Sequence, residues 1–153
     1  MGHLPGDIND KMEPYLASYR TVMKKLSENG TAYFDAMAKK KDIRMVPVNS
    51  IRGCTFDNCT FILDEAQNFD WHEMNTIVSR MGENTNMIIL GDLNQIDRRR
   101  WKKQDSGLYK LISSKPFLTS PITSVTALTE QYRSPITQLV AEVHEWIKKE
   151  ETR

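Results

Sequence analysis

Hydrophobic positions along the chain follow two different spacings, which predict alternating helices and strands. Apolar residues recur at helical spacing from Ile8 to Leu26 and again from Ile136 to Ile147. Two short runs between them, Phe61–Leu63 and Met87–Leu90, are apolar throughout. Continuous runs of this length are typical of parallel strands that are buried on both faces. The pattern therefore predicts an α/β fold in which a parallel sheet is flanked by helices.

Capping and turn residues predict the remaining elements. Asp70, with Glu73 three residues later, predicts a capped helix that ends at Gly82. Ser134 followed by Pro135 predicts the start of the last helix. Weaker signals predict a break or kink of the first helix at Pro14, a helix from Thr31 to Ala38, a sheet-edge strand from Met45 to Val48, a helix capped by Asp105, and a strand from Val125 to Leu128.

Composition narrows the class of protein. The chain has 153 residues, and 21 Lys and Arg nearly balance 20 Asp and Glu, for a formal charge of +1. This length suits one domain, and the charge excludes a histone-like polycation, so nucleic-acid binding would need a local patch. Cys54 and Cys59 allow one disulfide at most and no four-ligand metal cage, and we expect each to be a buried or free thiol. With no apolar run long enough for a membrane span and no leader pattern, we expect a cytoplasmic protein without membrane contact.

Two acids directly follow the first apolar run. In parallel sheets, ligands bind beyond the carboxyl ends of the strands, where Asp64 and Glu65 are expected. This is the Walker B arrangement of nucleotide hydrolases, in which Asp64 would hold Mg²⁺ and Glu65 would deprotonate the attacking water. Alone, the pattern fits a solvated turn before a helix equally well.

The second apolar run ends in Gly91–Asp97, and a third polar segment contains Arg133. Neighbouring strands would bring Asp92 and Gln95 beside the two acids. Gln95 is suited to contact a γ-phosphate or the attacking water, and Arg133 to clamp phosphate oxygens. Taken singly, Gln95 reads as a surface amide and Arg133 as a salt-bridge partner, but the three motifs in this order favour a phosphate site.

A basic segment follows at once, with five positive charges around one indole. It consists of Arg98, Arg99, Arg100, Trp101, Lys102 and Lys103. Cations for phosphates and an aromatic ring for base stacking suit a single-stranded nucleic acid. The alternative is a solvated basic loop with Trp101 packed on the body. The other basic tract, Lys39–Lys41, is interpreted as a helix end.

These motifs resemble the C-terminal part of PhoH-like proteins, and the phosphate-facing ones are similar to those of superfamily 1 helicases. The resemblance runs from LPGD through VPVNSIRGCTFDNCTFILDEAQN, GDLNQID and SGL to QYRSP. It implies part of a P-loop NTPase core of RecA-like fold, with a helical segment at 1–42 and the Walker B to arginine-motif core at 43–153.

The resemblance also implies the ligands and the site. It implies ATP and Mg²⁺ as cofactors, RNA or single-stranded DNA as a partner, and a ring-shaped homo-oligomer. Asp64, Asp92 and Arg52 are then assigned to cofactor binding, with Asp64 as the Mg²⁺ ligand. Glu65, Gln95 and Arg133 are assigned to catalysis. Arg133 would act within its own subunit or across a ring interface.

One family motif is missing from these residues. The family's phosphate-cradling loop is GxxxxGK[ST], and none of the seven glycines here is followed by lysine. The chain is therefore interpreted as a fragment, as half of a split gene product whose other half supplies the loop, or as an inactive remnant. A bacterial or phage gene fits each case. We expect ATP hydrolysis only when that half is supplied, and the rival interpretation is a non-catalytic module that binds nucleic acid or protein.

Overall fold

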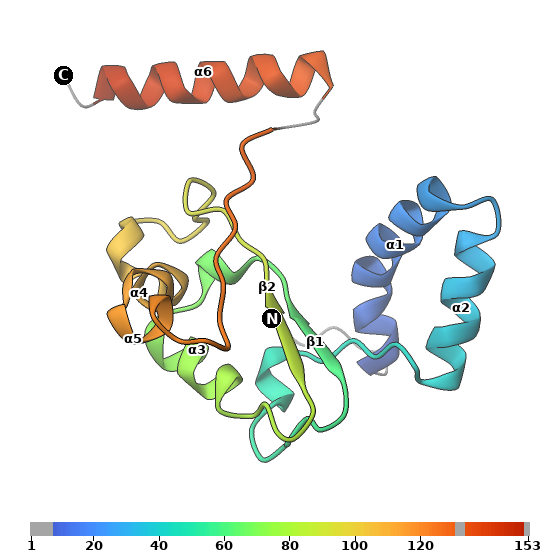
Figure 1. Ribbon diagram of the computed structural model, residues 1–153. Coiled ribbons are helices and arrows are strands. Elements are labelled where there is room, and N and C mark those ends of the chain that lie inside the picture. The colour runs from blue at the N-terminus through green and yellow to red at the C-terminus, as the bar shows by residue number, and fades with distance from the viewer. Residues whose placement is uncertain (1–7, 131–133, 152–153) are drawn as a thin grey trace. The chain divides into compact units, whose positions relative to one another are not determined.

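The computed structural model describes residues 8–130 and 134–151 (Figure 1). The helices are α1 (Ile8–Leu26), α2 (Gly30–Lys40), α3 (Trp71–Val78), α4 (Gly107–Ser113), α5 (Lys115–Leu118) and α6 (Pro135–Glu151), and the strands are β1 (Thr60–Leu63) and β2 (Asn86–Ile89). Three short 3-10 helices are η1 (Val48–Ser50), η2 (Ala66–Asn68) and η3 (Lys103–Asp105). The chain divides into two compact units, residues 1–108 and 109–153.

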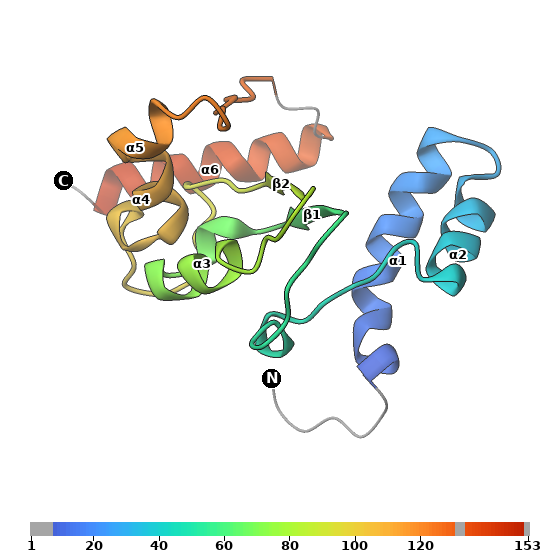
Figure 2. The same ribbon diagram turned by 60° about the horizontal axis from the view of Figure 1, so that its bottom comes forward.

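The first unit opens with a helical hairpin of α1 and α2, which run antiparallel in Figure 2. Gly30 lets the two helices meet, because a Cβ at this position would overlap the backbone carbonyl of Met23. Arg20 Nε lies 2.6 Å from Asp35 Oδ1 across the hairpin. α1 is continuous through Pro14, so the break considered from the sequence does not occur.

The centre of the first unit is a two-stranded parallel sheet. β1 and β2 pair in register from Thr60 with Asn86 to Leu63 with Ile89, which confirms the predicted parallel strands. The α/β architecture is likewise as predicted. Burial on both faces is not, because Leu63 is 5% exposed whereas Ile62 and Ile88 are 53% and 46% exposed. One face of this sheet is therefore open among the described residues.

Helix α3 lies along one side of the sheet in both views (Figures 1 and 2). Its predicted capping box is confirmed: Asp70 Oδ1 accepts from the Glu73 amide at 2.8 Å, and Glu73 Oε2 accepts from the Asp70 amide at 2.9 Å. The helix ends at Val78 rather than at Gly82. The core of the described residues consists of Phe34, Ile51, Leu63, Ala66, Met74, Ile77 and Leu108.

Two predicted strands are wrong. Residues 45–47 are irregular and Val48 begins η1, because Pro47 has no amide proton for a strand partner and precedes a tight turn. The segment 125–128 pairs with no strand among the described residues, and Leu128 is 90% exposed. An apolar run alone is not sufficient for a strand when it has no neighbour with which to pair.

Two predicted helix starts are also wrong. α2 begins at Gly30 after Asn29 and extends to Lys40, so Thr31 lies inside the helix rather than capping it. Asp105 closes η3 by accepting from the Lys102 amide at 2.8 Å, and α4 starts two residues later, at Gly107. In both cases the helix begins at a glycine that packs closely against a neighbour.

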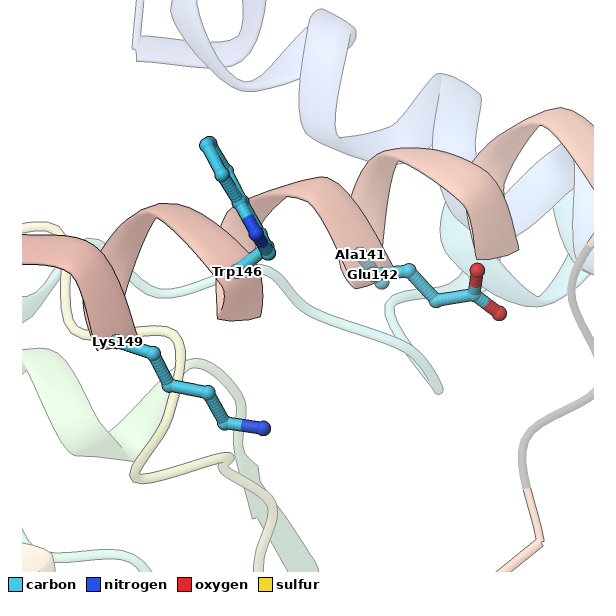
Figure 3. Close-up of a pocket in the computed structure, with 4 residues that line it drawn as sticks. All are labelled: Ala141, Glu142, Trp146 and Lys149. Atoms are coloured by element: carbon cyan, nitrogen blue, oxygen red, sulfur yellow. The ribbon is translucent and has the colours of Figure 1, made fainter.

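The second unit contains the end of α4, then α5 and α6. The predicted start of α6 at Pro135 is confirmed, and the Ser134 hydroxyl contacts the Thr137 hydroxyl at 2.8 Å. A shallow hollow on this helix is lined by Ala141, Glu142, Trp146 and Lys149. The side chains of Glu142, Trp146 and Lys149 point in different directions (Figure 3). A hollow lined by the side chains of a single helix does not by itself indicate a binding site. No helix in the described part of the chain combines the length and apolar character that a membrane span requires.

Candidate functional site

The carboxyl ends of β1 and β2 meet at one edge of the sheet. The Leu90 amide donates to the Leu63 carbonyl at 2.8 Å, and the Ala66 amide donates to the Leu90 carbonyl at 2.9 Å. The two predicted motifs therefore follow adjacent strands and lie side by side at this edge of the sheet (Figure 1). This edge is the candidate site.

Asp64 and Glu65 form a tight turn at that edge. Both side chains are exposed, and Asp64 Oδ1 accepts from the Glu65 amide at 2.9 Å. Glu65 has φ 53° and ψ 36°, a left-handed conformation that costs a non-glycine residue about 1–2 kcal/mol. The backbone turns here, and the Glu65 carboxylate accepts a hydrogen bond from the side-chain amide of Gln67.

The other oxygen of Asp64 is contacted from α1. Tyr19 donates its hydroxyl to Asp64 Oδ2 at 3.3 Å. Burial raises the pKa of Tyr19 above its ordinary value of 10.0, and the negative charge of Asp64 and the hydrogen bond raise it further. Sequence reasoning did not identify Tyr19, because it lies 45 residues before Asp64 on the apolar stripe of a helix.

A buried amide joins the two motifs. Gln67 is 1% exposed, and its Nε2 donates to Glu65 Oε2 at 2.6 Å and to the Gln95 carbonyl at 3.1 Å. Its Oε1 accepts from the Asp92 amide at 3.1 Å. Sequence reasoning missed Gln67, and the only signal was its place two residues after the acidic pair.

Asp92 and Gln95 organise the loop after β2. Asp92 Oδ1 accepts from the Asn94 amide at 2.8 Å, and Asp92 Oδ2 accepts from Gln95 Nε2 at 2.7 Å. The Gln95 side chain is exposed, and an amide nitrogen has a second hydrogen for a ligand. The structure thus brings Glu65, Asp92 and Gln95 together around Gln67.

This edge of the sheet offers carboxylate oxygens, which are suitable ligands for Mg²⁺. Asp64 offers exposed carboxylate oxygens, and Mg²⁺ is commonly held by one or two carboxylates together with waters and substrate phosphates. Within residues 8–130 and 134–151, no group of three or more acidic, His or Cys side chains could hold a metal. A Mg²⁺ ion held by Asp64 would take waters and phosphate oxygens as further ligands.

One predicted site residue, Arg52, lies in a separate turn, and another falls outside the described residues. Arg52 is exposed in a turn in which the Cys54 amide donates to the Ile51 carbonyl at 3.0 Å, and Gly53 supplies the positive φ of 84°. This conformation explains the glycine, and within the described part of the chain no contact joins Arg52 to Asp64. Arg133 lies outside the described residues.

The basic segment 98–103 is partly engaged with the body. Arg98 donates to both carboxylate oxygens of Glu73, at 3.1 and 2.9 Å, and its guanidinium lies 4.3 Å from the ring centroid of half-buried Trp101. One face of the indole is therefore covered. The other four cations, which are Arg99, Arg100, Lys102 and Lys103, are exposed.

The short SGL segment, Ser106–Leu108, packs against residues near the site. Gly107 donates its amide to the Phe69 carbonyl at 2.7 Å, and a Cβ on it would come within 2.8 Å of Met74 Cβ. Leu108 packs near Gly91, where an added Cβ would lie 2.7 Å from Leu108 Cδ2. These contacts hold the segment after β2 against the start of α3.

Comparison with known proteins gives one consistent family. The family model described as PhoH-like protein matches residues 1–145. The chain is similar to the PhoH-like protein of Bacillus subtilis (35% identical over 97 residues, 63% of this chain) and to Protein PhoH of Escherichia coli K12 (37% over 101 residues, 65% of this chain). It is also similar to Protein PhoH2 of Bacillus subtilis, at 29% identity over 145 residues, or 94% of this chain.

The matched regions are a minor part of these relatives. They cover 30%, 28% and 32% of the three proteins, respectively. The 153 residues therefore correspond to about a third of the length of the curated relatives that they match.

Proposed function

The chain belongs to the PhoH-like protein family, and we propose that it forms the Walker B-bearing part of an ATP-hydrolysing P-loop protein. The observation that carries the proposal is the pairing of two parallel strands whose carboxyl ends bear Asp64 and Glu65 on one side and Asp92 and Gln95 on the other. Ligands of α/β proteins bind at such an edge.

Each residue has a role in the proposal. Asp64 holds Mg²⁺, and the bound ion supplies charge neutralisation at the phosphates. Glu65 accepts the proton of the attacking water. Gln95 uses its side-chain amide to contact the γ-phosphate or that water, and Asp92 holds the loop that presents it. Arg133 stabilises charge on the phosphate oxygens, and Arg52 contributes to nucleotide binding.

The phosphate-cradling loop comes, in this proposal, from a polypeptide outside the 153 residues. None of the seven glycines is followed by lysine, so these residues alone would hydrolyse ATP slowly or not at all. The open sheet face with exposed Ile62 and Ile88 supports the proposal, because a neighbouring strand and helix would cover it. We place the assembly in the cytoplasm of a bacterium or of a phage-infected host.

The test is Mg²⁺-dependent ATP hydrolysis by the chain mixed with a polypeptide that carries GxxxxGK[ST]. We expect turnover only in the mixture, and loss of about 10²–10⁴-fold on Glu65→Gln, because the general base is removed. The matched control is Glu83→Gln, which makes the same chemical change at an exposed acid in the turn before β2. Absence of turnover in the mixture, or full activity of Glu65→Gln, would contradict the proposal.

A second candidate function is the binding of RNA or single-stranded DNA by the segment 98–103. Its support is the set of four exposed cations, together with the position of the segment directly after the Gln95 loop. Such binding weakens steeply with salt, by about 0.7 logarithmic units of affinity per logarithmic unit of salt for each phosphate contact to a single strand.

The experiment compares two variants that each remove three positive charges. Changing Arg99, Arg100 and Lys102 together to Gln should lower the affinity for a single-stranded oligonucleotide and flatten its salt dependence. Changing Lys39, Lys40 and Lys41 together to Gln should leave both nearly unchanged, although all three lysines are exposed too. Equal losses in the two variants would indicate attraction by net charge without a site.

A further inference from the structure

Three consecutive residues after Glu65 bond to the segment that follows β2. The Ala66 amide donates to the Leu90 carbonyl at 2.9 Å, and the Gln67 side chain bonds to the Asp92 amide and the Gln95 carbonyl at 3.1 Å each. Asn68 Oδ1 accepts from the Asp97 amide at 2.9 Å. The loop 91–97 is thus held at its beginning, middle and end by one short stretch of chain.

The hydrogen bonds fix the orientation of the Gln67 amide. Its nitrogen faces the Glu65 carboxylate and the Gln95 carbonyl, which both accept, and its oxygen faces the Asp92 amide, which donates. Turning the amide over would set its oxygen against two acceptors. At 1% exposure, water cannot replace these bonds without opening the loop.

Gly91 gives independent support. A Cβ at this position would lie 2.8 Å from Gln67 Oε1 and 3.2 Å from the Gln67 backbone nitrogen. The backbone of the loop 91–97 therefore passes so close to the Gln67 side chain that only a glycine fits at position 91.

We propose that Gln67 and Asn68 form an amide clamp, in which Gln67 is the positioning residue that sets the Gln95 loop against the Glu65 carboxylate. Asn68 extends the clamp to Asp97, the residue directly before the basic segment 98–103. The catalytic consequence rests on the proposed function, whereas the clamp itself is a property of this chain.

The clamp is tested in the 153-residue chain by hydrogen exchange at single amides, followed by NMR. Gln67→Met keeps the volume and removes the hydrogen bonds, so we expect exchange at the Asp92 amide to rise by about tenfold or more. Asn68→Ala, at a half-buried position, should raise exchange at the Asp97 amide and leave that of Asp92 nearly unchanged.

The matched control is Ser106→Ala. The Ser106 side chain is as buried as Gln67, and its hydroxyl makes no hydrogen bond within the described residues. We expect this variant to leave both amides protected. Unchanged exchange at Asp92 in Gln67→Met would overturn the proposal. A uniform rise over the whole unit would also overturn it, because that pattern indicates general packing.

A second readout uses the mixture that hydrolyses ATP. Gln67→Met should lower kcat by about 10–100-fold with little change in KM, because the displaced Gln95 loop affects the reacting groups rather than nucleotide binding. If the unaltered mixture shows no turnover, the proposed function fails and the exchange result alone decides on the clamp. If Gln67→Met leaves kcat unchanged in an active mixture, the clamp does not position the catalytic groups.

Discussion

The loop 91–97 and the basic segment 98–103 are adjacent in the sequence but are held in different ways. The loop is anchored by buried Gln67 and by half-buried Asn68. The basic segment is mostly exposed. Among the described contacts, Arg98 is its one residue that forms an ion pair, and its partner is Glu73. A substitution in the loop should therefore change folding stability and geometry, whereas a substitution in the basic segment should change binding and little else.

The largest expected effect comes from adding one methyl group to the anchored loop. In Gly91→Ala the new Cβ would press on Gln67 Oε1 and Leu108 Cδ2, so we expect a loss of about 1–3 kcal/mol in the free energy of unfolding. Urea unfolding followed by circular dichroism measures the change. Exchange at the Asp92 amide should rise in the same variant.

Gly53→Ala is the control for this substitution. Gly53 has φ 84° but nothing within 4 Å of an added Cβ, so the variant reports backbone strain without a steric clash. If Gly91→Ala is no less stable than the unaltered chain, the loop is not tightly held and the contrast with the basic segment fails.

The second prediction isolates the strain at Glu65. Glu65→Gly and Glu65→Ala both lose the bond to Gln67, but only glycine relieves the left-handed backbone. We expect the glycine variant to be more stable than the alanine variant by about 1 kcal/mol, again in urea unfolding. At Glu83, which has no positive φ, the order of the two variants should be reversed. The same order at both positions would indicate that the turn at Glu65 is unstrained.

Local patterns in the sequence were sufficient for the elements of this site but not for the contacts between them. Asp70 and Glu73 predict the start of α3, because a capping box is completed within four residues. The two apolar runs predict β1 and β2, since each ends abruptly in polar residues. The strand expected at 125–128 fails because pairing depends on a neighbour, which periodicity does not report.

The contacts of Gln67 could not be predicted from the sequence. Its partners Asp92 and Gln95 lie 25 and 28 residues away, and only the register of β1 with β2 brings them together. A glutamine after two acids is, from the sequence alone, indistinguishable from a solvated amide. Tyr19 was missed for the same reason, because its contact with Asp64 depends on where α1 lies.

A smaller effect is expected in the basic segment. Glu73→Gln weakens the pairing of Arg98 and removes one negative charge, so single-stranded oligonucleotide affinity should rise by up to about fivefold. The salt dependence should steepen by about 0.7, because one more cation becomes available for phosphate. Glu83→Gln removes one negative charge elsewhere and should change neither the affinity nor its salt dependence. If Glu73→Gln has no effect, Arg98 does not contact the nucleic acid.

The smallest expected effect concerns the hydroxyl that holds Asp64. Because the pKa of Tyr19 is raised in the folded protein, its neutral form stabilises the fold fully below about pH 10, and this contribution is lost as pH rises through the folded pKa. The stability difference between the unaltered chain and Tyr19→Phe should therefore shrink as pH rises above about 10, as measured by urea unfolding. A difference independent of pH would mean that Tyr19 contributes by packing alone, and Asp64 would then be held only by its own turn, like an ordinary exposed carboxylate.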